Sequence, residues 1–457
     1  MDMKSNAKLS MLERIGYGVG DYSANLIYSS ISAFLLLYYT NVVGASAAMA
    51  ASIIAISKIF DGVSDLVMGL IVDRTHSRFG KARPWILRLC VPLAVATVLM
   101  FSVPDSLSEK GLFIYMFLTY NLVSTVFYTG INVPYASLNG LMTTNAYERG
   151  LLGNFRMILS TAGTMTVNTY VLKLVCAFGN GDQWNQAGWT RVYIIIGIAT
   201  IILNLFTFGV CKERVVEEKA EKENVPILKS LKGLFTNKYW VLMLIALLVM
   251  YFMMSCFYGS AAYYVQYVMG DISYFASISN ALSIAQIITM FCTPFLMMKL
   301  SKRNTMLIGA FIQVIGFVGT GLAGNNLSMQ IMMSVVKGIG FGCAAAVMFG
   351  LLQDAITYGQ WKNGYGTVGM GNAASSFGMK VGSGIGTAAL GAILNIGKFN
   401  SALEVQGIAA QNAITVSFAW IPVITAVTII ICMVFFDIDK IYGKVTEDLA
   451  NGRYKED

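Results

Sequence analysis

The sequence predicts an all-α integral membrane protein with about twelve transmembrane helices in two six-helix bundles. Hydrophobic residues make up 56% of the 457-residue chain and charged residues only 12%, with a mean hydropathy of +0.64. Soluble domains carry roughly 25% charged residues. The net charge of +8 comes from short loops between long apolar runs. We therefore expect a lipid bilayer as a partner and no nucleic acid.

Each predicted span is a long apolar run bounded by polar or charged residues. Several runs are longer than a bilayer requires, and we expect these helices to tilt or to extend beyond the membrane. The twelve predicted spans cover residues 16–43, 48–72, 85–103, 111–138, 151–177, 192–211, 239–268, 272–298, 306–323, 328–352, 368–396 and 413–436.

Lys and Arg residues gather in alternate loops, and such loops stay on the cytoplasmic side of a membrane. That side receives Arg149, Lys362, the segment 212–238 and both chain ends. The N-terminal stretch is polar and shows no apolar region or cleavage site typical of a signal peptide. We therefore predict a multi-pass protein of the cell membrane (the cytoplasmic or inner membrane), with both termini in the cytoplasm.

A charged linker divides the spans into two halves. We predict an N-terminal bundle over residues 1–211, a cytoplasmic linker over 212–238 with room for a short surface helix, and a C-terminal bundle with a cytoplasmic tail over 239–457. The turn MGLIVDRTHSRFGKARPWIL in the first half has a weaker counterpart, FLMMKLSKRNTMLIG, in the second. Two such halves around a cavity at the membrane midplane are the layout of major-facilitator transporters.

Two carboxylates lie in the middle of the second span. Asp61 and Asp65 are four residues apart and share one helix face, and Lys58 lies near that face. An acid in hydrocarbon costs at least about 2.5 kcal/mol, so two acids require a reason. One interpretation is a structural ion pair with Lys58 or with another helix. We favour the other interpretation, a cation site that faces an internal cavity.

Other ionisable residues within the spans are expected to face this cavity or one another. In the first span, Asp21, Asn25 and Tyr28 form a polar stripe. In the eleventh, Ser376 and Lys380 are one turn apart, so the ammonium points into the same cavity. The residues singled out for this reason are Asp21, Lys58, Asp61, Asp65, Arg156, Lys337 and Lys380.

The fourth span carries hydroxyl and amide side chains ahead of Pro134. Such a face suits a ligand with many hydroxyl groups. It also suits hydrogen bonds between helices, and for a single Ser or Thr both interpretations stay open. The residues that we single out on this face are Tyr120, Asn121, Ser124, Tyr128, Thr129 and Asn132.

The turn after the second span is strongly basic, and we predict that it gates the transporter. It would hold the two bundles together in the outward-open state, with Asp73 near a helix N-terminus or a basic partner. The alternative is that its charges only fix the membrane topology. The predicted gating residues are Asp73, Arg74, Arg78 and Lys81.

Six motifs spread over both halves give the chain a specific resemblance to a known family. It resembles the glycoside–pentoside–hexuronide:cation symporters, the group that includes melibiose permease and belongs to the major facilitator superfamily. The most specific motif is the one around Asp61 and Asp65. The matching stretches are IGYGVGDYSANLIY, KIFDGVSDLVMGLIVDRTHSRFGKARPWIL, YTGINVPYASL, FRMILSTAG, DAITYGQWKNG and SSFGMKVGSGIG.

The resemblance implies a secondary active transporter that imports a glycoside, oligosaccharide, pentoside or hexuronide by symport with a cation through alternating access. It places the cation on Asp61, Asp65 and the Thr129 hydroxyl, which would be Na⁺ ligands if the coupling ion is sodium. The coupling ion is Na⁺ or H⁺, and no other cofactor is expected. The sugar site that it implies comprises Asp21, Tyr28, Tyr128, Asn132, Arg156, Ser376 and Lys380, to which the polar stripe of the first span adds Asn25.

The chain departs from melibiose permease at two positions of the fourth span. Asn132 and Ala136 stand where that protein has an aspartate and a tryptophan that stacks on the sugar. The missing ring and carboxylate leave room for a sugar other than melibiose. We expect the chain to function as a monomer.

Other classes of function are less compatible with this sequence. A symporter of lysolipids or other amphiphiles would favour an apolar groove, against which the polar stripes of the first and fourth spans argue. A membrane enzyme would need a nucleophile–base pair, a metal cluster or a nucleotide-binding loop, and we identify none of them. We therefore do not expect an enzyme. A sensor would need a signalling domain longer than either tail.

Overall fold

The chain is described here by a computed structural model that covers residues 8–143, 146–215, 227–365, 368–451 and 453–454. Within these ranges the regular structure is helical and contains no strand. Long apolar runs produce this result, because a helix satisfies all of its own backbone hydrogen bonds in a bilayer. The predicted all-α membrane fold is thus confirmed.

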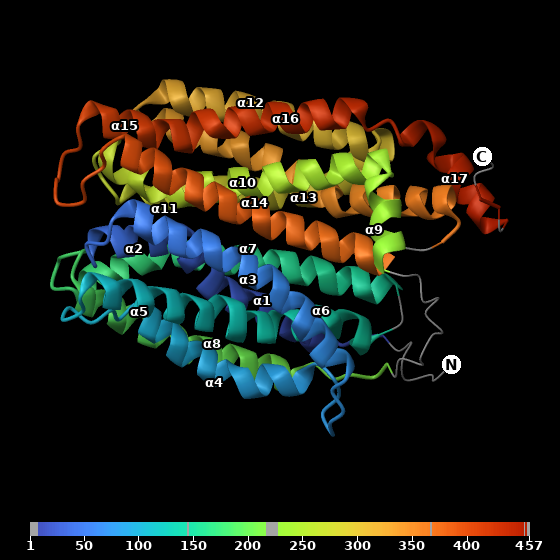
Figure 1. The fold of residues 1–457 in the computed structure, drawn as a ribbon, viewed down its shortest axis with the longest axis horizontal. Helices are drawn as coiled ribbons and strands as arrows, with labels where there is room; N and C mark the ends of the chain where they lie inside the picture. Colours follow the sequence, from blue (N-terminus) through green and yellow to red (C-terminus); the bar gives the residue numbers. More distant parts are fainter. Residues whose placement is uncertain (1–7, 144–145, 216–226, 366–367, 452, 455–457) are drawn as a thin grey trace. The chain divides into compact units, whose positions relative to one another are not determined.

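Residue contacts divide the chain into two compact units (Figure 1). The first unit comprises Met1–Ala220 with Leu394–Gly407, and the second comprises Glu221–Ile393 with Ile408–Asp457. Each unit is described by itself below. The domain boundaries at residues 211 and 238 stay a prediction from the sequence.

Six long helical stretches build the first unit, and two of them contain a π-helical turn. The first stretch runs without a break through α1, η1 and α2, and the fourth through α5, η2 and α6. The bounds are α1 Met11–Ser30, η1 Ile31–Leu35, α2 Leu36–Asn41, α3 Ala47–Asp73, α4 Arg83–Met100, α5 Glu109–Asn121, η2 Leu122–Tyr128, α6 Thr129–Met142, α7 Ala146–Phe178 and α8 Gln186–Val210.

The second unit has six further long stretches and two short helices, α9 and α17. In Figure 1, α9 runs across the ends of the long helices of its unit, within the segment predicted as the linker. The bounds are α9 Ile227–Phe235, α10 Lys238–Tyr267, α11 Tyr274–Lys299, α12 Lys302–Ala323, α13 Leu327–Asn363, α14 Val368–Ile396, α15 Ile408–Thr415, η3 Val416–Trp420, α16 Ile421–Phe435 and α17 Asp439–Ala450.

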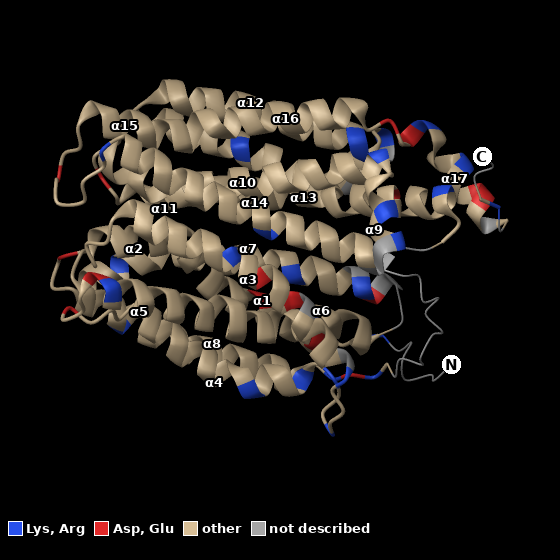
Figure 2. Cartoon of the chain, in the orientation of Figure 1, with Lys and Arg blue, Asp and Glu red and all other residues tan. Residues whose placement is uncertain are grey.

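Nine helices of the described chain are long and apolar enough to cross a membrane. The other three long stretches are α1–α2, α3 and α7, and each carries several charged residues. Figure 2 shows that most charged residues lie near helix ends and in loops, while a few lie along the helices. Charged side chains inside a span mark functional positions. The first unit therefore holds most of the intramembrane charge.

Several helices extend further than the apolar runs predict, because polar contacts hold their ends. Asn185 caps the start of α8 at Gln186, ahead of the predicted residue 192. The tenth predicted span ends at residue 352, whereas α13 continues to Asn363. In that extension Asp354 binds Lys302, and the Trp361 indole donates to Asp448 at 3.0 Å. Hydropathy alone does not reveal such partners.

Close packing of α1 on α7 positions the charged residues of the first unit. A Cβ atom at Gly163 would lie 2.8 Å from the backbone oxygen of Tyr22, so only glycine fits there. Small residues let transmembrane helices approach each other in this way. As a result, the polar face of α1 meets the polar face of α7 directly.

Candidate functional site: a carboxylate cluster and an acid–arginine pair

The Asp61 carboxylate lies inside the first unit and is surrounded by donors. Its residue is only 3% exposed. The Thr125 hydroxyl donates to Oδ1 at 2.5 Å, and the Ser124 hydroxyl donates to Oδ2 at 2.8 Å. The Lys58 ammonium lies 3.5 Å from Oδ2. Both carboxylate oxygens therefore have partners from α3 and η2.

Asp65 lies one turn further along α3 and faces the start of α6. The Thr129 hydroxyl donates to Asp65 Oδ1 at 3.1 Å. One turn before Asp61, the Asn121 amide donates to the Ser57 hydroxyl at 2.8 Å. Polar residues of α3 thus meet polar residues of the fourth stretch turn by turn. The predicted cation residues Asp61, Asp65 and Thr129 lie along this single interface.

Two adjacent hydroxyl groups that reach the same carboxylate lie in the π-helical turn η2. In an α-helix, neighbouring residues such as Ser124 and Thr125 point about 100° apart. A π turn is wider and occurs frequently at functional sites. Helical periodicity therefore missed Thr125, which the sequence analysis did not single out. No sequence signal for the π turn would have revealed it.

The second cluster is an acid–arginine pair between α1 and α7. Asp21 Oδ1 lies 3.3 Å from Arg156 Nε, and the side chains are 9% and 33% exposed. The Asn25 amide donates to the Asp21 backbone oxygen and to the Ser160 hydroxyl at 2.7 Å. The Arg156 guanidinium also lies over the Tyr135 ring, 5.4 Å from its centroid. Carboxylate and guanidinium groups of this kind can bind the hydroxyl groups of a polyol.

Two tyrosines of the predicted sugar site lie beside Lys58 of the carboxylate cluster. The rings of Tyr28 on α1 and Tyr128 in η2 stack, with their centroids 6.0 Å apart. The Lys58 ammonium lies 5.6 Å from the centroid of the Tyr28 ring. Tyr28 is 37% exposed, so its ring is available to a ligand. Lys58 therefore contacts both the carboxylate cluster and the predicted sugar residues.

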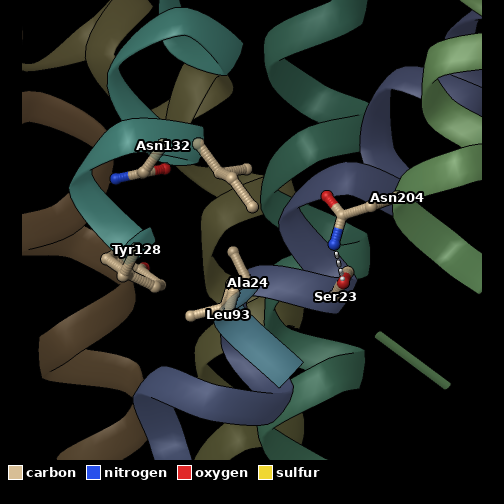
Figure 3. A pocket seen from close by; sticks show the side chains of 7 residues that line it. Ser23, Ala24, Leu93, Tyr128, Asn132 and Asn204 are labelled. Carbon is tan, nitrogen blue, oxygen red and sulfur yellow. Dashed lines mark hydrogen bonds between the residues drawn. The ribbon is translucent and has the colours of Figure 1, made fainter. Parts of the chain in front are cut away.

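A small cavity in the first unit is lined by side chains that include Tyr128, Asn132 and Asn204 (Figure 3). In the figure, Asn132 and Asn204 lie on opposite sides of it, and the Asn204 amide donates to Ser23 at 2.9 Å. The buried Oδ1 atom of Asn132 has no hydrogen-bond partner. Such an oxygen is costly unless water or a ligand donates to it. Asn132 is thus suited to a ligand hydroxyl or to a bound water.

The remaining predicted sugar residues belong to the second unit. Ser376 and Lys380 are half-buried and lie one turn apart on α14. This helix packs closely on α10, because a Cβ atom at Gly382 would lie 2.2 Å from the Leu248 backbone oxygen. The participation of Ser376 and Lys380 in one site with Asp21 and Arg156 stays a prediction.

The basic turn between α3 and α4 is held by a residue that the sequence analysis missed. The Glu213 carboxylate accepts hydrogen bonds from the backbone N–H groups of Lys81, Ala82 and Arg83, at 2.8, 2.9 and 2.9 Å. A Cβ atom at Gly80 would lie 2.3 Å from this carboxylate, and Gly80 has φ +102°. Glu213 thus neutralises the N-terminus of α4 within the first unit.

The predicted gating side chains are less buried than the backbone of the turn that Glu213 binds. Arg74 and Arg78 are exposed, and Arg78 lies over the Phe79 ring. The side chain of Asp73 lies outside the described part of the structure. The proposed latch between the bundles stays a prediction.

Two ion pairs join the start of α1 to other segments of the first unit. Arg14 binds Glu148 on α7 through both of its carboxylate oxygens. Glu13 binds Arg214, which follows α8. Burial raises the pKa of Glu13, but hydrogen bonds from Ser10 and Arg214 outweigh burial and hold this pKa below its usual value. Glu13 therefore remains ionised and paired at neutral pH.

The surroundings of Lys337 differ from those that the sequence predicts. From the sequence we expect this residue to face the cavity or another ionisable residue, but it is completely buried in the second unit. Its Nζ atom has no hydrogen-bond partner. The ammonium instead faces the rings of Phe257, Phe317 and Phe418, with centroids at 5.0, 5.4 and 4.9 Å. Cation–π contacts therefore replace the expected ion pair.

These clusters define the chemistry that the first unit can perform. Within the described residues, no group of three or more His, Cys, Asp or Glu residues is placed to hold a metal ion. A monovalent cation would instead be held by the Asp61 and Asp65 carboxylates and by hydroxyl oxygens, which are the ligands that hard cations prefer. Buried charges within a bundle of membrane spans are typical of membrane proteins that move ions or polar solutes, and transporters are one such class.

Comparison with known proteins gives the family. Residues 16–440 match the family described as MFS/sugar transport protein, and the chain belongs to this family. It is 32% identical to the "Isoprimeverose transporter" of Lactiplantibacillus pentosus, over 97% of this chain and 92% of that protein. It is 30% identical to the "Putative glycoside/cation symporter YagG" of Escherichia coli (strain K12), over 91% of this chain and 90% of that protein.

A solved structure has the same fold at low sequence identity. The nucleoside transporter NupG matches 93% of this chain and 99% of its own with a TM-score of 0.62 at 14% identity, which is a likeness of fold alone. The family and fold confirm the predicted major-facilitator architecture and show that the chain is a transporter and not an enzyme. The chain is a multi-pass membrane protein. The names of its relatives support cation-coupled transport of a sugar-type small molecule.

Proposed function

We propose that this protein imports a glycoside, oligosaccharide, pentoside or hexuronide into the cell by symport with Na⁺ or H⁺. The cation binds to Asp61 and Asp65, with Thr129 as a hydroxyl ligand if the ion is Na⁺. The protein lies in the cell membrane with both termini in the cytoplasm, and transport proceeds by alternating access. The sugar-binding residues are Asp21, Asn25, Tyr28, Tyr128, Asn132, Arg156, Ser376 and Lys380.

One observation supports this proposal most strongly. A hydroxyl-ringed carboxylate cluster and an acid–arginine pair lie in the same unit, and Lys58 lies beside both Asp61 and the ring of Tyr28, a proposed sugar residue. Symport requires that the cation and the sugar change each other's affinity. The position of Lys58 between a proposed cation ligand and a proposed sugar residue gives a physical basis for this coupling. The polar side chains of the two clusters also favour a sugar over a lysolipid as the substrate.

Uptake into proteoliposomes tests the proposal. The purified full-length protein is reconstituted, and uptake of radiolabelled sugars is measured under an inward Na⁺ gradient or an inward proton gradient, each imposed separately. Isoprimeverose is the first probe, followed by glucuronides and other glycosides. We expect accumulation above the equilibrium level with one of the two gradients.

Variants of the carboxylate cluster provide the specific comparison. Asp61→Asn and Asp65→Asn should abolish gradient-driven accumulation, whereas exchange of sugar down its gradient can survive in one of them. Lys173→Met removes an exposed charge from the same unit and serves as the control. Undiminished accumulation in the double variant Asp61→Asn/Asp65→Asn would show that the cation binds elsewhere.

A further inference from the structure

Lys58 occupies the place that a coupling cation would need. Its side chain is 12% exposed, and its ammonium lies 3.5 Å from Asp61 Oδ2. The same carboxylate already accepts from Ser124 and Thr125. A hydroxyl group can rotate and offer a lone pair to a cation, whereas an ammonium group has only donors. A metal cation can therefore bind Asp61 only when the Lys58 ammonium moves away.

Another neighbour of Lys58, the aromatic ring of Tyr28, shows where this ammonium can go. Its Nζ atom is 5.6 Å from the centroid of Tyr28, whose ring stacks on Tyr128. An aromatic face attracts an ammonium group without a carboxylate. Tyr28 and Tyr128 belong to the proposed sugar site, so the displaced ammonium would enter that site as a donor for sugar hydroxyl groups.

We propose that Lys58 is a tethered competitor of the coupling cation: it pairs with Asp61 when no cation is bound, and cation binding displaces it toward Tyr28 and the sugar. This inference rests on the proposed cation site at Asp61 and adds the residue that sets its affinity. Cation binding then supplies a donor to the sugar site. By linkage, bound sugar retains the ammonium there and raises cation affinity by the same factor.

Lys58→Met tests the inference without a sugar, with Na⁺ as the probe. The melting temperature of the purified full-length protein is measured against Na⁺ concentration, with choline keeping the ionic strength constant. A bound ion stabilises the folded protein according to its concentration and dissociation constant. Methionine keeps the apolar stem and removes the competitor. We expect the half-maximal Na⁺ concentration to fall at least about fivefold, the lower end of the usual coupling range.

Two further variants make the result specific. Lys58→Arg keeps a permanent charge beside Asp61, so its half-maximal Na⁺ concentration should equal or exceed that of the wild type. This variant also preserves the ion pair in case Lys58→Met does not fold. Lys173→Met, an exposed lysine of the same unit, should behave as the wild type. In the presence of isoprimeverose, the ratio of sugar affinities with and without Na⁺ should fall toward one only in Lys58→Met.

The outcomes separate this inference from the proposed function. A Na⁺ response that appears or strengthens in Lys58→Met supports the inference, even if the wild type responds weakly. An unchanged or weaker Na⁺ response in Lys58→Met, or tighter Na⁺ binding in Lys58→Arg, overturns it. If Lys58→Met does not fold, the Lys58→Arg result decides. The proposed function fails separately, if neither a Na⁺ nor a proton gradient drives uptake of any tested sugar into the proteoliposomes.

Discussion

Replacement of Asp21 by asparagine should destabilise the protein and abolish sugar binding. The Asp21 side chain is 9% exposed and lies 3.3 Å from Arg156 Nε. At this distance and an effective dielectric constant of about 20, the attraction is about 5 kcal/mol. Loss of one partner from a buried pair costs about 3–5 kcal/mol. Because Arg156 is 33% exposed, water screens part of this cost, and we expect about 2–3 kcal/mol.

A double-mutant cycle measures this coupling directly. The unfolding of wild type, Asp21→Asn, Arg156→Gln and the double variant is followed in detergent at neutral pH. The double variant should lose less stability than the sum of the losses of the two single variants. It carries neither charge, so no buried charge is left unpaired. Binding of a sugar that the wild type transports should be lost in all three variants, while a Na⁺-dependent rise in melting temperature persists.

Two results would refute this reasoning. If the Asp21→Asn variant unfolds within about 0.5 kcal/mol of the wild type, the pair contributes nothing beyond a surface ion pair. If this variant binds a transported sugar with unchanged affinity, Asp21 does not belong to the sugar site. The second result leaves the cation assignment intact, since Asp61 and Asp65 lie on a different helix.

Three further substitutions test other contacts. Glu213→Ala should remove about 1–2 kcal/mol of helix capping and slow transport more than it weakens Na⁺ binding; equal losses of both would indicate misfolding. Lys337→Met should raise the unfolding free energy by about 1–3 kcal/mol, because a buried donor without a hydrogen-bond acceptor costs more than its cation–π contacts return; a lower melting temperature contradicts this. Glu13→Gln should lower the melting temperature at pH 7. Since the pKa of Glu13 is lowered by folding, that difference should shrink as the pH falls below the usual value of 4.5 and vanish below the lowered pKa of the folded protein.

Hydropathy and charge predict most of the fold because the bilayer imposes simple rules. Apolar runs locate the spans, and the family and fold confirm this architecture. The ends of helices are harder to predict. The last turns of α13 are polar in sequence, and only their contacts with Lys302 and Asp448 explain why the helix continues to Asn363. Such contacts join residues that are far apart in the chain.

Part of the candidate site could also be predicted from the sequence, because the bilayer restricts which side chains occur within a span. Asp61 and Asp65 stand out because acids are rare in apolar runs. Thr125 does not stand out, since a hydroxyl group is common in spans and the π turn shifts the helical face. Glu213 lies after α8, in a charged segment where one more acid carries no signal. Lys337 stands out, but its aromatic surroundings come from three separate stretches of chain.

The charges of the two clusters predict how many cations accompany each sugar. When all are ionised, Asp21, Asp61 and Asp65 contribute three negative charges and Lys58 and Arg156 contribute two positive charges. Within the first unit this net charge of minus one favours the binding of one monovalent cation. Lys380 of the proposed sugar site would add one positive charge, so a second cation would leave an uncompensated positive charge with or without Lys380. We therefore expect one cation per neutral sugar. In proteoliposomes with the membrane potential clamped at zero, the accumulation ratio of the sugar should then rise in direct proportion to the ratio of cation concentrations. A rise with the square of that ratio would show two cations and contradict the charge argument.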